Sequence, residues 1–324
     1  MKILVTGACG YKGSVLVPKL LAHNGARVIA IDAMWFGDGG LTKLAANHEN
    51  GQLLLIDGDI RTMDLEHVLK GIDTIIHLAS VANDPCANLN PALTWDVIAN
   101  GTVRLADAAV RAGVKHFIYA SSASVYGISD KPNVTEDTPP VPLTVYNQAK
   151  YVAERALRGM EQSGMHVTIV RPATVCGLSP AMRTDLVVNL LTMQALNRGK
   201  ITVLGGKQHR PNIHVEDITD LYCWLLKHPM NYTLNAGYEN LTVSEIAAAV
   251  AERTGAEVET RESNDDRSYR LDSDLLATFG WTPKRTVASA IDEIVMAHNT
   301  GALIEDDHMS RVNWMRREGI GESR

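Results

Sequence analysis

The sequence lacks the features that mark secreted, membrane or nucleic-acid-binding proteins. Its cysteines are Cys9, Cys86, Cys176 and Cys223, without CxxC or Cys/His metal spacing, so we expect reduced thiols and no metal site. No apolar run approaches the roughly 20 residues that span a bilayer, and no signal peptide precedes the first apolar segment. With 31 basic and 37 acidic residues, a surface that tracks nucleic-acid phosphates is not expected. These absences favour a cytoplasmic protein without nucleic-acid or membrane partners.

The first half of the chain alternates between short apolar runs and helical stretches. Strands are expected over 3–5, 27–31, 53–56, 74–78, 116–120 and 167–170, and helices over 13–23, 63–70, 91–112 and 147–161. Such alternation is typical of βαβ units. It predicts an α/β fold with a doubly wound parallel sheet covered by helices on both faces.

After Pro172 the loops lengthen and the rhythm changes. Helices are expected over 186–198 and 243–254, separated by short strands over 201–204 and 258–260. The domains expected are a Rossmann domain over 1–172, a smaller α/β lobe over 173–299 that mainly binds substrate, and a tail over 300–324. The cleft between the lobes is the expected site. The tail lacks clear periodicity, and we interpret it as a partly ordered extension, with an oligomer contact as the alternative.

A glycine-rich turn follows the first apolar run and opens the first helix, with glycines at Gly7, Gly10 and Gly13. A strand, a glycine turn and a helix in this order place a dinucleotide diphosphate on a helix N-terminus. Asp32 ends the second strand, where a carboxylate accepts hydrogen bonds from the adenosine ribose and repels a 2′-phosphate. This spacing favours NAD over NADP. The alternative for Asp32 is a solvated residue at a strand end.

Two further parts of the cofactor site are expected beside this turn. Asp59 and Ile60 follow the third strand and are placed to meet the adenine. Lys12 stands inside the glycine turn, where its side chain either extends towards the phosphates or reaches solvent. The sequence does not decide between these two orientations of Lys12.

A phenol and an ammonium, Tyr146 and Lys150, lie four residues apart in an expected helix and therefore on one helix face. A cation beside a phenol favours the phenolate, which suits acid–base work at a hydroxyl. Together with the dinucleotide turn, this pair predicts hydride exchange between a nicotinamide and an alcohol or ketone.

Several short motifs follow one another along the chain. They are Thr6–Gly13, His77–Ser80, Ser121–Gly127, Tyr146 with Lys150, Arg171-Pro172 and Asn212–Asp217. These segments resemble, in order and spacing, the motifs of the extended short-chain dehydrogenase/reductases, the NAD-dependent nucleotide-sugar epimerases and dehydratases. The resemblance covers residues 1 to about 295. Within the family, 175–183 and 266–269 resemble a branch that includes nucleotide-heptose 4-dehydrogenases and deoxysugar enzymes.

The resemblance implies roles for individual residues. Tyr146 matches the catalytic acid/base, Lys150 the lysine that holds the nicotinamide ribose and lowers the pKa of the phenol, and Ser122 the hydroxyl that bonds the reacting oxygen. Tyr11, Leu78 and Ala79 match cofactor contacts; Ala123, Asn189, Arg210 and Arg267 match contacts to a nucleotide-diphosphate sugar. Arg210 immediately precedes the strand motif, whereas Arg267 lies in a charged run and is nearly as easily a solvated loop arginine.

The residues after Ser122 bear on the reaction type. Sugar dehydratases of this family carry an acidic pair there, and nucleotide-glucuronate decarboxylases usually carry a glutamate at the second position. Here Ala123 and Ser124 cannot remove a carbon-bound proton. Dehydration and decarboxylation are therefore disfavoured, and hydride transfer at one carbon, usually C4, remains.

The first expectation for function is thus an NAD-dependent nucleotide-sugar 4-epimerase that works through a 4-keto sugar, and we also expect a homodimer. A one-way 4-dehydrogenase or 4-ketoreductase shares all of these residues and stays open as an alternative. A non-catalytic NAD(H)-binding regulatory protein is a third candidate. It is disfavoured because such proteins typically lose the tyrosine or the lysine, and both are present here.

Overall fold

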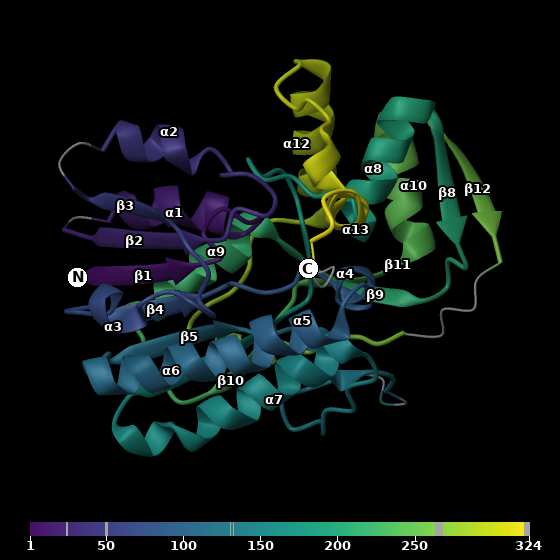
Figure 1. The fold of residues 1–324 in the computed structure, drawn as a ribbon. Helices are drawn as coiled ribbons and strands as arrows, with labels where there is room; N and C mark the ends of the chain where they lie inside the picture. Colours follow the sequence, from purple (N-terminus) through teal and green to yellow (C-terminus); the bar gives the residue numbers. More distant parts are fainter. Residues whose placement is uncertain (24, 49–50, 130, 132, 263–267, 321–324) are drawn as a thin grey trace.

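The protein folds into a larger and a smaller lobe (Figure 1). The computed structural model describes residues 1–23, 25–48, 51–129, 131, 133–262 and 268–320. The larger lobe is built on a mostly buried sheet with helices on both faces, and the smaller lobe carries two short sheets and several helices. The predicted α/β class with a doubly wound sheet is confirmed.

The large sheet has seven strands, all parallel to their neighbours, in the order β10-β6-β5-β4-β1-β2-β3. They are β1 (Lys2–Thr6), β2 (Arg27–Asp32), β3 (Leu53–Asp57), β4 (Thr74–His77), β5 (His116–Ala120), β6 (His166–Pro172) and β10 (Thr233–Ala236). The chain runs outwards from β1 to β3 and then returns to the other side of β1 with β4. This reversal opens a crevice at the carboxyl ends of β1 and β4, where folds of this kind bind ligands.

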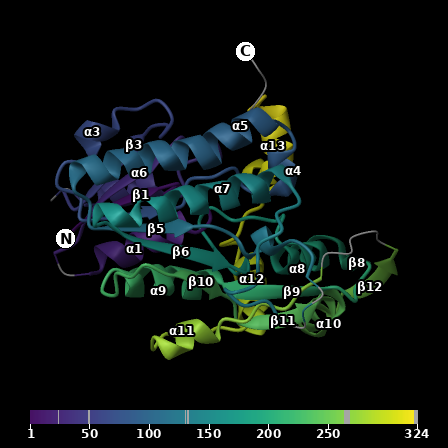
Figure 2. The same cartoon turned by 90° about the horizontal axis from the view of Figure 1, so that it is seen from below.

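Helices cover both faces of this sheet (Figure 2). On one face lie α1 (Gly13–Leu21) and α9 (Val215–Leu225); on the other lie α3 (Leu65–Val68), α6 (Gly101–Ala112) and α7 (Val145–Gly159). Short helices α2 (Leu41–Ala46), α4 (Asp84–Ala87) and α5 (Pro91–Trp95) complete the lobe. The strands are buried between two helical layers, which explains why they read as continuous apolar runs.

The long helix expected over 91–112 contains an irregular turn. Its first part, α5, continues through a π turn at Asp96–Asn100 into α6. A π turn adds one residue to a turn, so it shifts the apolar periodicity without interrupting it. The sequence pattern therefore predicts one regular helix and does not reveal the π turn.

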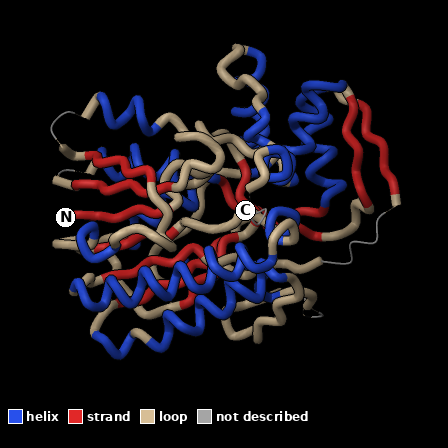
Figure 3. The backbone as a smooth tube through the Cα atoms, viewed as in Figure 1, coloured by secondary structure: helices blue, strands red, loops and turns tan. Residues whose placement is uncertain are grey.

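The smaller lobe has its own core. A three-stranded sheet joins β7 (Thr174–Cys176), β9 (His209–His214) and β11 (Glu239–Thr242), and a two-stranded sheet joins β8 (Lys200–Leu204) and β12 (Glu257–Arg261). Helices α8 (Val187–Arg198), α10 (Val243–Thr254) and α12 (Val287–Asn299) accompany them (Figure 3). The short helix α11 (Asp274–Thr278) instead contacts β10 of the large sheet. Residues of α8, α10, α12 and β8 form a separate hydrophobic cluster, as expected for a second lobe.

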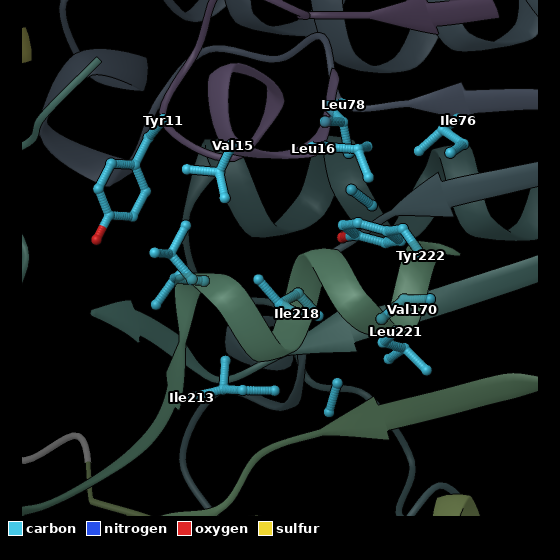
Figure 4. Packing of buried hydrophobic residues seen from close by; sticks show 14 of the residues in the cluster. Tyr11, Val15, Leu16, Ile76, Leu78, Val170, Ile213, Ile218, Leu221 and Tyr222 are labelled. Carbon is cyan, nitrogen blue, oxygen red and sulfur yellow. The ribbon is translucent and has the colours of Figure 1, made fainter. Parts of the chain in front are cut away.

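The predicted domain boundary at residue 172 does not separate the two lobes completely. Helix α9 and strand β10 return to the large lobe, where β10 pairs with β6 and α9 packs against α1. Figure 4 shows this core, with Leu16 of α1 facing Ile218 and Tyr222 of α9. The range 173–299 is therefore not one lobe, because 215–236 supplies an edge strand and a covering helix to the first domain.

The tail is an ordered part of the fold over its described residues. A short 3-10 turn (Asp307–Met309) leads into α13 (Arg311–Arg317), which contacts α4 of the large lobe. Arg311 and Met315 are buried. The interpretation of the tail as a partly ordered extension is corrected for this segment, since it crosses from α12 to the large lobe and packs there (Figures 1 and 2).

Candidate active site

The glycine turn after β1 is shaped by contacts that leave no room for side chains. Gly7 has a φ of 68°, and a Cβ there would lie 2.5 Å from the main-chain nitrogen of Ala79. At Gly13 a Cβ would lie 2.3 Å from the carbonyl oxygen of Ala8. The turn can therefore press against the end of β4 and feed directly into α1, whose first N–H groups receive no side-chain cap. Such N–H groups suit an anion.

A carboxylate lies at the end of β2, beside this turn. Asp32 accepts hydrogen bonds from the main-chain N–H groups of Cys9 (2.9 Å) and Met34 (2.8 Å). Burial raises the pKa of Asp32. These bonds hold the carboxylate at one wall of a cavity that is also lined by Ile31, Trp35, Phe36, Gly58, Asp59, Ile60, Leu78, Ala79 and Val97. The predicted cofactor residues Asp59, Ile60, Leu78 and Ala79 are thus brought together with Asp32.

Asp59 is held in an ion-pair network that the sequence did not reveal. The guanidinium of Arg61 contacts both carboxylate oxygens of Asp59, with the shortest distance 2.6 Å, and reaches Asp96 at 3.1 Å. The same guanidinium lies 5.9 Å from the ring centroid of Trp35. Asp59 therefore lines the cavity with its charge already paired.

A second cavity continues from the glycine turn towards the smaller lobe. It is lined by Gly7, Gly10, Tyr11, Lys12, Gly13, Ser122, Tyr146 and Lys150 among the predicted residues, together with Phe36, Asp84, Arg183, Leu186, Tyr269 and Arg311. The three predicted catalytic side chains thus share one cavity with the predicted diphosphate turn. Both cavities open at the carboxyl edge of the sheet, where β1, β4 and β5 end.

Ser122 and Tyr146 reach this cavity from different elements. Ser122 follows β5 and caps a 3-10 turn, and its Oγ lies 2.7 Å from the hydroxyl of Ser124, which donates a hydrogen bond to Asn147 (2.6 Å). Tyr146 stands in the first turn of α7. Burial, assisted by the carboxylate of Asp84, raises the pKa of Tyr146 to about 12, while hydrogen bonding with Ser122 opposes the rise.

Lys150 lies one helical turn further along α7. It is 2% exposed, and its ammonium donates a hydrogen bond to the carbonyl oxygen of Ala120 (2.8 Å). The ammonium lies 5.8 Å from the centroid of the Tyr146 ring. Burial and the nearby Lys12 lower the pKa of Lys150. That Lys150 lowers the pKa of the phenol stays a prediction.

A buried ion pair lies between β6 and α7, next to the catalytic residues. Arg171 at the end of β6 binds both carboxylate oxygens of Glu154 on α7, at 3.0 and 2.6 Å. The hydroxyl of Ser121 also donates to Glu154, and Arg171 donates to the hydroxyl of Tyr126 (2.8 Å). This network ties β5, β6 and α7 together directly behind the neighbouring Ser122.

The predicted substrate residues are more scattered. Ala123 is 1% exposed and belongs to the hydrophobic core. Asn189 is fully buried, and its amide binds the N–H of Gly177 (3.0 Å) and the hydroxyl of Tyr11 (3.1 Å). Neither Ala123 nor Asn189 is among the residues that line the two cavities. Asn189 instead joins Tyr11 of the glycine turn to the smaller lobe.

Two predicted substrate residues remain, Arg210 and Arg267. Arg210 stands in β9, away from the lining of both cavities, and donates a hydrogen bond to the carbonyl oxygen of His209 (3.2 Å). Arg267 lies outside the described residues. Both stay predictions as substrate contacts.

Two cavity arginines were not singled out in the sequence. Arg183 is the last residue of the segment 175–183 that the resemblance marked, and it is paired with Asp185 at 2.8 Å. Arg311 comes from the tail, where no motif points to it. Among the described residues, no group of three or more His, Cys, Asp or Glu side chains is arranged to hold a metal ion. No helix in the same part of the chain is long and apolar enough to cross a bilayer.

Comparison with known proteins agrees with this arrangement. The sequence model of the NAD dependent epimerase/dehydratase family matches residues 3–237. The chain therefore belongs to this family, and the resemblance inferred from the motifs is confirmed. It is 30% identical over 327 residues to a UDP-glucose 4-epimerase of Lactobacillus helveticus, with 91% of this chain and 95% of the relative covered.

Solved structures of two epimerases are similar along most of the chain. The UDP-glucose 4-epimerase of Thermotoga maritima with UDP-glucose has a TM-score of 0.82 at 26% identity, covering 94% of this chain and 100% of the other. The UDP-glucuronic acid 4-epimerase of Bacillus cereus, in complex with UDP-glucuronic acid and NAD, has a TM-score of 0.82 at 25% identity, covering 90% and 97%.

Proposed function

We propose that this protein is an NAD-dependent nucleotide-sugar 4-epimerase. The observation that carries the proposal is that Ser122, Tyr146 and Lys150 line one cavity with the glycine turn at the carboxyl edge of a doubly wound sheet. The UDP-glucose and UDP-glucuronic acid 4-epimerases to which the chain is similar support the reaction at C4. The uncharged Ala123 and Ser124 after Ser122 argue against dehydration and decarboxylation.

The cofactor site fits NAD on the chain's own geometry. Side chains at Gly7 or Gly13 would collide with backbone atoms within 2.5 Å, so the turn presents main-chain N–H groups to an anion. Asp32 supplies a fixed carboxylate for a ribose diol. When bound, NAD supplies a hydride acceptor next to the catalytic side chains.

The protein's own part in the reaction is proton transfer and positioning. Ser122 is placed to bond the C4 oxygen of the sugar, and Tyr146 takes the proton from that hydroxyl and later returns it to the 4-keto sugar. Burial raises the pKa of Tyr146, so the surroundings of the phenol favour its protonated form. Proton abstraction from the C4 hydroxyl requires a positioned base, and Tyr146 is proposed for this role.

Incubation with UDP-glucose and, separately, UDP-galactose tests the proposal, with products separated by chromatography. An epimerase forms the other sugar from either side and releases no NADH. Stoichiometric free NADH with a ketone product would instead indicate a 4-dehydrogenase. If no nucleotide sugar of the UDP, GDP, CDP or dTDP series is converted while the folded protein binds NAD, the proposed reaction is wrong.

Asp32 leads to a prediction on cofactor choice. We expect NAD to bind more tightly than NADP by roughly tenfold or more, because the buried carboxylate repels a 2′-phosphate. Asp32→Asn should reduce this ratio, and Asp107→Asn on the surface of α6 should leave it unchanged. Fluorescence titration of each dinucleotide measures the ratio. Equal affinities of the unaltered protein for NAD and NADP would remove the assigned role of Asp32.

Arg210 leads to a prediction on the substrate. If its charge serves the substrate diphosphate, Arg210→Ala should raise the KM for the nucleotide sugar by roughly tenfold, as expected for loss of a charge-assisted hydrogen bond. The affinity for NAD should change little. Arg198→Ala, an exposed position on α8, is the matched control. An unchanged KM would leave Arg210 a structural residue of β9.

We also propose a cytoplasmic homodimer. The four cysteines are free, which suits a reducing compartment. Light scattering on the purified protein tests the homodimer, and a monomeric mass at micromolar concentration would contradict it.

A further inference from the structure

The tail brings a buried cation to the mouth of the cofactor site. Arg311, the first residue of α13, is 2% exposed and lines the same cavity as the glycine turn. Its guanidinium donates hydrogen bonds to the carbonyl oxygens of His308 (2.7 Å) and Ala181 (3.0 Å) and stacks over Phe36 at 4.5 Å from the ring centroid. Among the described residues no carboxylate forms an ion pair with Arg311. A buried charge without an anion is costly.

Two further cations face this cavity. Lys12 projects from the glycine turn, and its ammonium forms no hydrogen bond or ion pair with the described residues. Arg183 from the smaller lobe lines the cavity as well, paired with Asp185. Burial and the charge of Arg183 lower the pKa of Lys12 to about 8 and that of Arg311 to about 10. Three mutually repelling cations around one cavity indicate a site built for a polyanion.

The position of Arg311 favours the cofactor's diphosphate over the substrate's. Phe36, on which the guanidinium stacks, lines both cavities and follows β2 close to Asp32. Lys12 is the residue that precedes α1, directly beside the N–H groups of the glycine turn. A dinucleotide that has its ribose at Asp32 and its nicotinamide end at Tyr146 runs along the cavity that Lys12 and Arg311 both line.

The tail also contacts several segments that surround the two cavities. The indole N–H of Trp314 donates a hydrogen bond to the carbonyl oxygen of Trp35 (2.6 Å), on the loop that lines the adenosine cavity. On the other side, the N–H of Thr184 donates to the carbonyl oxygen of Met309 (3.0 Å). Met315 is 1% exposed and packs in a cluster with residues of α4 and of the β2–α2 loop. The segment thus connects three walls of the cavity.

We propose that the C-terminal segment 303–320 is a clasp that completes the cofactor site, in which Arg311 and Lys12 bind the diphosphate of the dinucleotide from opposite sides. The inference rests on the proposed binding of NAD. A clasp anchored at Trp35, Phe36, Ala181 and Thr184 has to detach before the dinucleotide leaves. The clasp therefore slows exchange of the cofactor, as suits an epimerase that regenerates its cofactor in every turnover.

The dissociation rate of NADH tests the clasp. Protein loaded with NADH is mixed with an excess of NAD, and the loss of bound NADH fluorescence is followed. Arg311→Met should release NADH roughly tenfold faster or more, because it removes a charge-assisted contact from a buried site. Arg316→Met is the matched control, because Arg316 is exposed on the same helix and its loss should not change the rate.

A second variant separates the clasp from the charge and guards against misfolding. Trp314→Phe keeps an aromatic ring beside His308 and Arg317 and removes the hydrogen bond to Trp35. It should also accelerate NADH release, while the melting temperature of the ligand-free protein stays close to that of the unaltered protein. The proposal is overturned if both variants fold and release NADH at the unaltered rate. It is also overturned if Arg311→Met weakens binding of UDP but not of ADP-ribose, since the cation would then serve the substrate's diphosphate.

A failure of the proposed function looks different in the same assay. If the unaltered protein does not retain NADH at all, the assignment of NAD itself fails. If it retains NADH and the variants do so equally, only the clasp fails.

Discussion

Tyr146→Phe is expected to reduce epimerisation by roughly a hundredfold or more, as for loss of a positioned general acid–base. The substitution removes only the oxygen that carries the proton, and the ring keeps its place in the cavity wall. Binding of NAD and the unfolding temperature should therefore stay near those of the unaltered protein. Turnover of a nucleotide sugar under single-turnover conditions, together with NAD titration, measures both sides of the prediction.

Two neighbouring substitutions give the controls for Tyr146. Ser122→Ala should lower turnover less than Tyr146→Phe, because it removes one hydrogen bond rather than the proton carrier. Lys150→Ala should damage turnover and NAD binding together, since its ammonium is expected to serve the nicotinamide ribose as well as the phenol. Normal turnover by Tyr146→Phe would exclude the proposed mechanism, whatever the state of the other two residues.

Arg171→Ala is expected to be the most destabilising single change considered for this protein. It leaves the carboxylate of Glu154, whose side chain is 3% exposed, buried without its cation. Breaking a buried ion pair in this way costs about 3–5 kcal/mol of the free energy of unfolding. Urea unfolding followed by circular dichroism measures the loss. Arg155→Ala, at an exposed position on the same helix as Glu154, should change little.

A double variant distinguishes the ion pair from simple loss of packing. Replacing both charges at once, Glu154→Leu with Arg171→Met, removes the uncompensated carboxylate, and apolar replacements of similar volume are often well tolerated. The double variant should therefore be more stable than Arg171→Ala. If it is less stable, the cost lies in the contacts of Tyr126 and Ser121 rather than in the buried charge of Glu154.

The parts of the fold that were predictable from sequence are those encoded by local spacing. The glycine turn at Gly7–Gly13 and the carboxylate at Asp32 each follow an apolar run by a fixed number of residues, so their meeting at one sheet edge follows from the parallel topology. Tyr146 and Lys150 share a helix face because they lie four residues apart. The structure brings these side chains to the connected cavities, as their spacing indicated.

The remaining features depend on tertiary contacts between distant parts of the chain. Nothing local in Arg311 distinguishes it from its neighbours Arg316 and Arg317; only the docking of α13 buries the first and leaves the others exposed. Asn189 matches a family contact by position, yet its amide is hydrogen-bonded to Tyr11 and Gly177, which are 178 and 12 residues away in the sequence. Burial likewise raises the pKa of Tyr146, an effect of packing that the spacing between Tyr146 and Lys150 does not reveal.

The return of α9 and β10 to the large sheet limits how specificity could be exchanged between relatives. A chimaera cut at residue 172 would carry away the partner of β6 and expose that strand as a new sheet edge, a common cause of aggregation. A graft that respects the fold has to be made in separate inserts that keep the recipient's own 215–236 and also its α11, because α11 contacts β10. The tail would have to come from the recipient as well, because it is fitted to the recipient's Trp35 and Phe36.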